Sequence, residues 1–207
     1  MNENEEAEGI KVILVGQTGT GKTSLINTAM GQKFVPGTQI SSMNCSFVEL
    51  TKVIEDTEYT INLWDTMGQE KYRSLTKVFF KNSDIVIVVF DITSKASFDD
   101  LDYWFKEIEN ELGNEPIKGL AANKADLYLE QAVDDDTIKE YAQKKDVIYK
   151  YTTATTPNNF SEWLTQLLTE YLEKNSSDKR KKIIGKKLEI NDEPAVKKKK
   201  CCWNIFV

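Results

Sequence analysis

Eight consecutive residues near the N-terminus have the types and spacing of a phosphate-binding loop. The segment GQTGTGKT fits the pattern G-x-x-x-x-G-K-[ST] at every fixed position. Glycines let a turn bring several backbone N–H groups to one point, at the positive end of the following helix, and phosphate oxygens bind there. The lysine of this pattern reaches the β- and γ-phosphates, and the next hydroxyl can ligate Mg²⁺. We therefore predict a nucleotide site built from Gly16, Gln17, Thr18, Gly19, Thr20, Gly21, Lys22, Thr23 and Ser24.

A second polar segment, DTMGQ, directly follows the predicted strand segment Ile61–Trp64. A carboxylate at a strand end can hold Mg²⁺, usually through water, so Asp65 is a candidate metal ligand beside Thr23. Gly68 offers a backbone N–H where a γ-phosphate would sit, and Gln69 could orient an attacking water. With Lys22, these two residues are the candidate catalytic groups for hydrolysis of the terminal phosphate.

A third segment, Asn123 to Asp126, follows the predicted strand Ile117–Ala122 and resembles the N-K-x-D motif of GTPases. A carboxylate at Asp126 can accept hydrogen bonds from both N1–H and the N2 amine of guanine. Adenine has no such pair of donors and would leave the carboxylate unpaired. Asn123, Lys124 and Asp126 therefore predict a guanine site. The phosphate loop alone also fits an ATP-handling enzyme, and competition between GTP and ATP separates the two.

Alternating strands and helices must position these loops. The strands that we predict are Ile10–Val15, Cys45–Val53, Tyr59–Trp64, Ile85–Phe90, Ile117–Ala122 and Val147–Tyr151. The predicted helices are Thr23–Met30, Ser97–Leu112, Asp136–Lys144 and a final helix with Thr156 as N-cap and Pro157 as its first residue. The alternation indicates an α/β fold with a mostly parallel sheet flanked by helices. The connection Glu55–Glu58 is too short for a parallel crossover, which makes the second and third strands antiparallel.

Charge divides the chain into two parts. The net charge is −6, but residues 175–207 carry ten Lys/Arg and only four Asp/Glu. We predict an acidic leader at 1–8, one globular domain at 9–174 and a flexible basic tail at 175–207. Because the domain itself is strongly acidic, we expect no nucleic-acid partner.

Composition excludes several classes of site. The chain has no histidine, which excludes histidine-dependent catalysis and histidine metal sites. Its three cysteines, of which two are adjacent, form neither a disulfide framework nor a metal spacing. No apolar run approaches the roughly 18 residues of a membrane span, and the acidic N-terminus is unlike a secretory signal. We therefore expect a cytosolic protein.

The motifs together resemble the Ras superfamily of small GTPases, and within it the Rab family, from about Ile10 to Leu172. Rab-like stretches are W-D-T-x-G-Q-E at residues 64–70 and S-F-x-x-L-x-x-W-x-x-E-I at residues 97–108. The resemblance implies a P-loop NTPase of the Ras-like G-domain fold, with six strands of which one is antiparallel. It also implies a monomeric, Mg²⁺-dependent switch between GTP- and GDP-bound states in vesicle trafficking. Its implied partners are an exchange factor, a GTPase-activating protein, effectors and a prenyl-binding chaperone.

The resemblance also assigns roles to individual residues. Ser42 matches the first-switch threonine that ligates Mg²⁺, and Thr38 is the alternative ligand if the longer loop shifts the alignment. Phe34 lies at the position of the aromatic that covers the guanine face; the alternative is a loop aromatic packed on the core. Thr153, Ala154 and Thr155 stand at the S-A-K loop that meets guanine O6, so the alanine is retained and the lysine is replaced.

Two departures from the family concern catalysis. Thr18 occupies a loop position that is glycine in Ras, where a side chain can crowd the water and an incoming arginine finger. Met67 replaces the usual alanine. We therefore expect slow intrinsic hydrolysis that needs an activating protein. The alternative is a degenerate GTPase that holds nucleotide as a scaffold with little hydrolysis.

The tail ends in a basic and apolar segment. Lys197–Lys200 precede Cys201 and Cys202, which resemble a doubly geranylgeranylated Rab terminus. Two lipid chains, or one chain and a basic patch, anchor a protein stably. Five residues follow, so the end is not C-a-a-X. We predict lipidation at both cysteines and residence on the cytoplasmic face of an endomembrane, with a cytosolic pool. A plain basic tail or a nuclear signal is the alternative.

Overall fold

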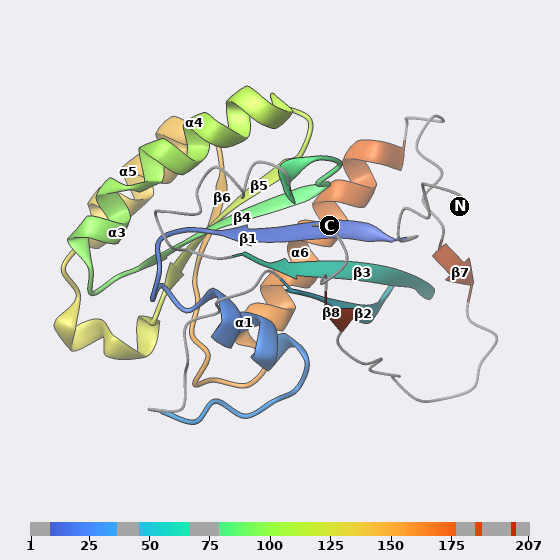
Figure 1. The fold of residues 1–207 in the computed structure, drawn as a ribbon, viewed down its shortest axis with the longest axis horizontal. Helices are drawn as coiled ribbons and strands as arrows, with labels where there is room; N and C mark the ends of the chain where they lie inside the picture. Colours follow the sequence, from blue (N-terminus) through green and yellow to red (C-terminus); the bar gives the residue numbers. More distant parts are fainter. Residues whose placement is uncertain (1–8, 37–45, 67–78, 177–184, 188–199, 202–207) are drawn as a thin grey trace.

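Six strands form one sheet in the order β6-β5-β4-β1-β3-β2 in the computed structural model of this chain (Figure 1). Among these six strands, only β2 runs antiparallel to its neighbour, β3, whereas the other five are parallel. The predicted six-stranded, mostly parallel sheet is therefore confirmed. The strands are β1 (Ile10–Val15), β2 (Ser46–Ile54), β3 (Thr57–Asp65), β4 (Ile85–Asp91), β5 (Ile117–Asn123) and β6 (Ile148–Tyr151).

The structure describes residues 9–36, 46–66, 79–176, 185–187 and 200–201. Two short tail segments in these ranges, β7 (Gly185–Lys187) and β8 (Lys200–Cys201), pair antiparallel with β3 and β2. Within the described ranges, no helix has the length and apolar character needed to cross a membrane.

Helices cover both faces of the sheet. Alternating side chains of β1 point to opposite faces, so Val12 and Leu14 join one apolar cluster while Ile13 and Val15 join the other. The first cluster includes α1 (Lys22–Ala29) and α6 (Asn159–Ser176). The second includes α3 (Lys95–Asp99), α4 (Leu101–Leu112) and α5 (Asp135–Lys145). All seven residues of β4 are buried, as expected for a strand that is covered on both sides.

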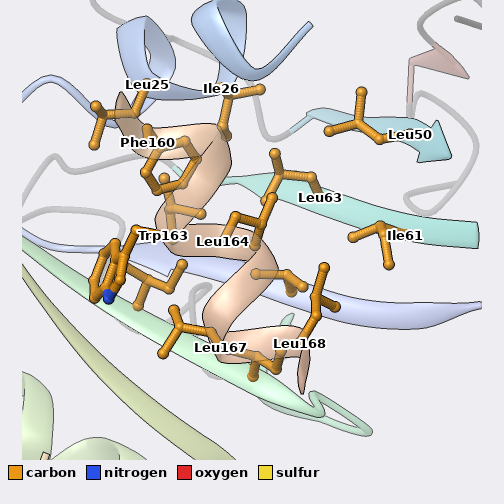
Figure 2. Packing of buried hydrophobic residues seen from close by; sticks show 14 of the residues in the cluster. Leu25, Ile26, Leu50, Ile61, Leu63, Phe160, Trp163, Leu164, Leu167 and Leu168 are labelled. Carbon is orange, nitrogen blue, oxygen red and sulfur yellow. The ribbon is translucent and has the colours of Figure 1, made fainter. Parts of the chain in front are cut away.

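Helix α6 contributes a continuous apolar stripe to the first cluster (Figure 2). Its buried side chains recur every three or four residues and comprise Phe160, Trp163, Leu164, Leu167, Leu168 and Tyr171. They share this cluster with Leu25 and Ile26 of α1 and with Ile61 and Leu63 of β3. This packing fixes α1, and with it the end of the phosphate loop, against the sheet.

Three predicted boundaries are wrong, two of them because left-handed residues redirect the chain. The β2–β3 turn has two residues rather than four, because Glu55 and Asp56 adopt left-handed φ values of 48° and 59° that suit a tight hairpin. The predicted helix 97–112 is two helices, α3 and α4, separated at Asp100. The last helix begins at Asn159 rather than Pro157, because Asn158 is left-handed at φ 65° and its carbonyl accepts from the Glu162 N–H.

Candidate nucleotide-binding site

The described parts of four loops that carry predicted site residues lie at one edge of the sheet. They follow β1, β3, β5 and β6, which are parallel to one another through the sheet. The carboxyl ends of parallel strands meet at the same edge, where α/β proteins bind ligands. Predicted residues that are far apart along the chain are therefore brought together here. Ser42, Gly68, Gln69 and Cys202 lie outside the described residues, as do Thr38 and Met67.

The phosphate loop has the backbone conformation of an anion cradle. Gly16, Gly19 and Gly21 have φ values of 141°, 81° and 96°, in the region that favours glycine. Helix α1 begins directly after Gly21, at Lys22. The positive end of its dipole therefore lies at the loop. Thr18 is exposed at the tip, and the buried Thr20 closes the turn by donating to the Gln17 carbonyl at 2.9 Å.

Lys22 is held inside this loop. Its side chain is 5% exposed, and its Nζ donates to the carbonyls of Gly16 and Gln17, each at 2.9 Å. Burial lowers the pKa of Lys22 to about 8, although the nearby negative charge of Asp65 acts in the opposite direction. A buried ammonium without full neutralisation is costly. The loop therefore favours a negatively charged ligand next to this nitrogen.

Thr23 and Asp65 form the described part of the candidate Mg²⁺ site. The Thr23 hydroxyl donates to Asp65 Oδ2 at 2.8 Å, so the two groups converge across the gap between α1 and β3. Asp65 is 3% exposed. Thr66 fixes the end of β3 by donating to the Leu14 carbonyl at 2.6 Å. A hydroxyl and a carboxylate are hard oxygen ligands, and this pair fits Mg²⁺.

Asn123 connects the phosphate loop to the two loops on the base side. Its Nδ2 donates to the Thr20 carbonyl at 2.7 Å, and its Oδ1 accepts from the Thr152 hydroxyl at 3.1 Å. The side chain is 2% exposed. A Cβ at Gly21 would lie 2.4 Å from Asn123 Nδ2, which gives a steric reason for glycine there. Asn123 thus holds loops together in this structure, a role that sequence reasoning did not specify.

Lys124 and Asp126 differ in their surroundings. Lys124 has a left-handed φ of 63°, and its Nζ pairs with Asp91 Oδ2 at 2.5 Å. Asp126 is exposed, and its Oδ1 accepts from the Thr153 hydroxyl at 2.5 Å. The predicted guanine carboxylate therefore touches the Thr153–Thr155 loop. Sequence reasoning missed Asp91, whose position at the end of a buried strand was the available signal.

The remaining predicted contact residues differ in their exposure. Ser24 is buried on α1 at 8% exposure, and Phe34 is half-buried in the segment that follows α1. Ala154 is half-buried, whereas Thr155 is exposed.

Three aromatic side chains that sequence reasoning missed form a cluster on β2, β3 and the segment before β4. The rings of Phe47 and Trp64 stack at 4.9 Å between centroids, and Trp64 lies 5.9 Å from Phe79. Lys11 Nζ lies 4.9 Å from the Trp64 ring centroid. Partly exposed aromatic rings of this kind are frequent in protein interfaces.

Comparison with known proteins agrees with this geometry. Residues 11–174 match the sequence profile of the Ras family. The chain is 30% identical to the "Ras-related protein RABA1b" of Arabidopsis thaliana, over 94% of each chain. It is 31% identical to the "Ras-related protein Rab-17" of Mus musculus, over 93% of this chain and 90% of that protein. It is also 30% identical to the "Putative ras-related protein Rab-5B" of Dictyostelium discoideum, over 83% of this chain and 79% of that protein.

Proposed function

Because this chain belongs to the Ras family of small GTPases, we propose that it is a Rab-type switch that binds and hydrolyses GTP in membrane trafficking. The observation that carries the proposal is the meeting of three groups at one sheet edge. These are the buried Lys22, the Thr23–Asp65 oxygen pair and the Asp126 carboxylate beside Thr153. Curated relatives with Rab names support the trafficking role.

Each group has a part in this function. The loop amides and Lys22 would hold the phosphates, while Asp126 selects the base. Thr23 and Asp65, with Ser42, would hold the Mg²⁺ that neutralises charge on the phosphates. Gln69 would orient the attacking water, and Gly68 would contact the γ-phosphate. In the Rab family, exchange factors, activating proteins, effectors and a prenyl-binding chaperone act on such a switch. The aromatic cluster of Phe47, Trp64 and Phe79 is the surface that effectors would bind.

A second candidate is a nucleotide-binding scaffold with little hydrolysis. The exposed side chain of Thr18 favours it, because it stands at the tip of the phosphate loop where a glycine would leave room for an arginine finger. The two candidates share the binding site and differ only in turnover.

Single-turnover hydrolysis separates the two candidates. We expect the wild-type protein to hydrolyse bound GTP slowly and to show no comparable turnover with ATP. Gln69→Leu should reduce the GTP rate by about tenfold or more, because the attacking water loses its orienting group. Phosphate release from preloaded protein is the measurement. Gln166→Leu, on the exposed side of α6, is the matched control and should leave the rate unchanged.

Two results would contradict the switch proposal. Equal rates for the wild-type protein and Gln69→Leu would favour the scaffold. Equal turnover of ATP and GTP would instead point to an ATP-handling enzyme.

We propose that the tail attaches the protein to the cytoplasmic face of an endomembrane through lipids on Cys201 and Cys202. The four lysines Lys197–Lys200 support this, since basic residues near anionic lipid strengthen a lipid anchor. Mass spectrometry of the protein from its native cells should find an isoprenoid on each cysteine. The double variant Cys201→Ser/Cys202→Ser should move from membranes to the soluble fraction, whereas Cys45→Ser should not. Unmodified cysteines in the native protein would refute the anchor.

A further inference from the structure

Three hydroxyl and carboxylate groups form a continuous hydrogen-bonded chain beside the predicted base site. The Thr153 hydroxyl donates to Asp126 Oδ1 at 2.5 Å. The Thr153 hydroxyl oxygen also lies 2.8 Å from the Thr155 hydroxyl and accepts the Thr155 backbone N–H at 3.0 Å. Thr153 is 7% exposed, and its own N–H donates to Asn159 Oδ1 at 3.0 Å. The position of Thr153 is therefore fixed at both its backbone and its side chain.

The chemistry of these groups determines which one donates in each of the hydrogen bonds. An ionised carboxylate can only accept hydrogen bonds, so the single proton of the Thr153 hydroxyl is used on Asp126. The Thr155 hydroxyl must then donate to the Thr153 oxygen. With the Thr155 N–H, this uses both lone pairs of Thr153. Hydrogen bonds that follow one another in this way polarise and strengthen each other.

We propose that Thr155 is a positioning residue for guanine recognition, which acts through Thr153 to hold the Asp126 carboxylate in one orientation. The inference rests on the proposed function, since it concerns the same base site. Asp126 is exposed and would otherwise sample several rotamers. The Thr153 hydroxyl uses one lone pair of Asp126 Oδ1. The second lone pair of Oδ1, and Oδ2, can then accept hydrogen bonds from the base. The Thr155 hydroxyl thereby helps to orient the guanine-binding carboxylate from a position where the family has lysine.

The test is a pair of variants that separate the hydroxyl from the shape of the side chain. Thr155→Val has nearly the same shape without the hydroxyl, and Thr155→Ser keeps the hydroxyl. We expect Thr155→Val to weaken GDP binding between about threefold and tenfold, the range of one net hydrogen bond. We also expect it to reduce the preference for GDP over inosine diphosphate, which lacks the N2 amine. Thr155→Ser should bind both nucleotides as the wild-type protein does.

The controls keep the result specific. Thr156→Val changes the next exposed threonine of the same loop and should leave both affinities unchanged. The melting temperature of each nucleotide-free variant checks that it folds. Unchanged GDP binding in Thr155→Val would refute the inference, and so would a Thr155→Ser variant that binds as poorly as Thr155→Val.

Asp126→Asn distinguishes failure of the inference from failure of the proposed function. If Asp126 selects guanine, this variant should lose GDP affinity and gain affinity for xanthosine diphosphate. An Asp126→Asn variant that binds both like the wild-type protein would refute the guanine site itself. A clear shift in Asp126→Asn, with no effect of Thr155→Val, would refute only the role of Thr155.

Discussion

Replacing Lys22 with methionine should weaken GDP binding by about two to three orders of magnitude, because the phosphates lose a buried positive partner. Lys22 is 5% exposed, and its Nζ donates to two neutral carbonyls, those of Gly16 and Gln17. Methionine has a similar length and can fill the same space. Titration calorimetry with GDP on the wild-type protein and Lys22→Met is the measurement. Lys139→Met, an exposed lysine on α5, should bind GDP normally.

The same variant has a second signature in the pH dependence of stability without nucleotide. Burial lowers the pKa of Lys22 to about 8 from an ordinary value of 10.5, so the folded state disfavours the charged form. Below pH 8 the lysine is charged in both states, so the full free-energy cost of burying the charge lowers stability. Between pH 8 and 10.5 the unfolded chain binds more protons, so stability rises with pH. Relative to Lys22→Met, the free energy of unfolding of the wild-type protein should rise by about 2 kcal/mol from pH 7.5 to 9.5.

Urea denaturation at the two pH values measures this difference, and GDP binding supplies an independent check. Phosphates favour the protonated lysine, so wild-type GDP affinity should fall above pH 8, by up to about tenfold per pH unit, with proton uptake on binding. If the wild-type protein and Lys22→Met show the same pH dependence of unfolding, Lys22 is not held in the environment described here.

Gly16→Ala should destabilise the protein by about 3 kcal/mol or more and abolish nucleotide binding. A Cβ at Gly16 would lie 2.1 Å from the Val89 carbonyl oxygen, and the φ of 141° is strained for alanine. Strain of this kind costs about 1–3 kcal/mol before any clash is counted. The carbonyl belongs to β4, a buried central strand, so the phosphate loop must move instead. Urea denaturation and GDP titration measure the two effects.

Gly31→Ala is the matched control for this prediction. Gly31 also has a positive φ, 77°, but no atom lies within 4 Å of a Cβ built there. Its replacement should cost about 1 kcal/mol from backbone strain alone and leave GDP binding intact. A Gly16→Ala protein as stable as Gly31→Ala would mean that the loop does not approach β4 as closely as the structure has it.

The helices and strands could be predicted wherever the residue pattern of one contiguous segment specifies them. The run Ile10–Val15 forms β1 with the predicted bounds, because a short apolar stretch followed by a glycine turn favours a buried strand. Two of the three errors lie where one backbone conformation decides a boundary. The chain changes direction at three left-handed residues, Glu55, Asp56 and Asn158. Non-glycine residues adopt that conformation only where the surrounding structure compensates for its energetic cost.

The sequence by itself determined which chemical groups this protein has for phosphate and base, because each motif is a contiguous stretch whose residue types specify its chemistry. The tertiary structure alone decided how those groups support one another. Asn123 reaches Thr20 across 103 positions of the chain, and Thr153 reaches Asp126 across 27. The burial of Lys22 and its pairing with two loop carbonyls likewise depend on how the loop folds against the sheet. Such contacts depend on strand order and register, which are set by the packing of both sheet faces and not by any single segment.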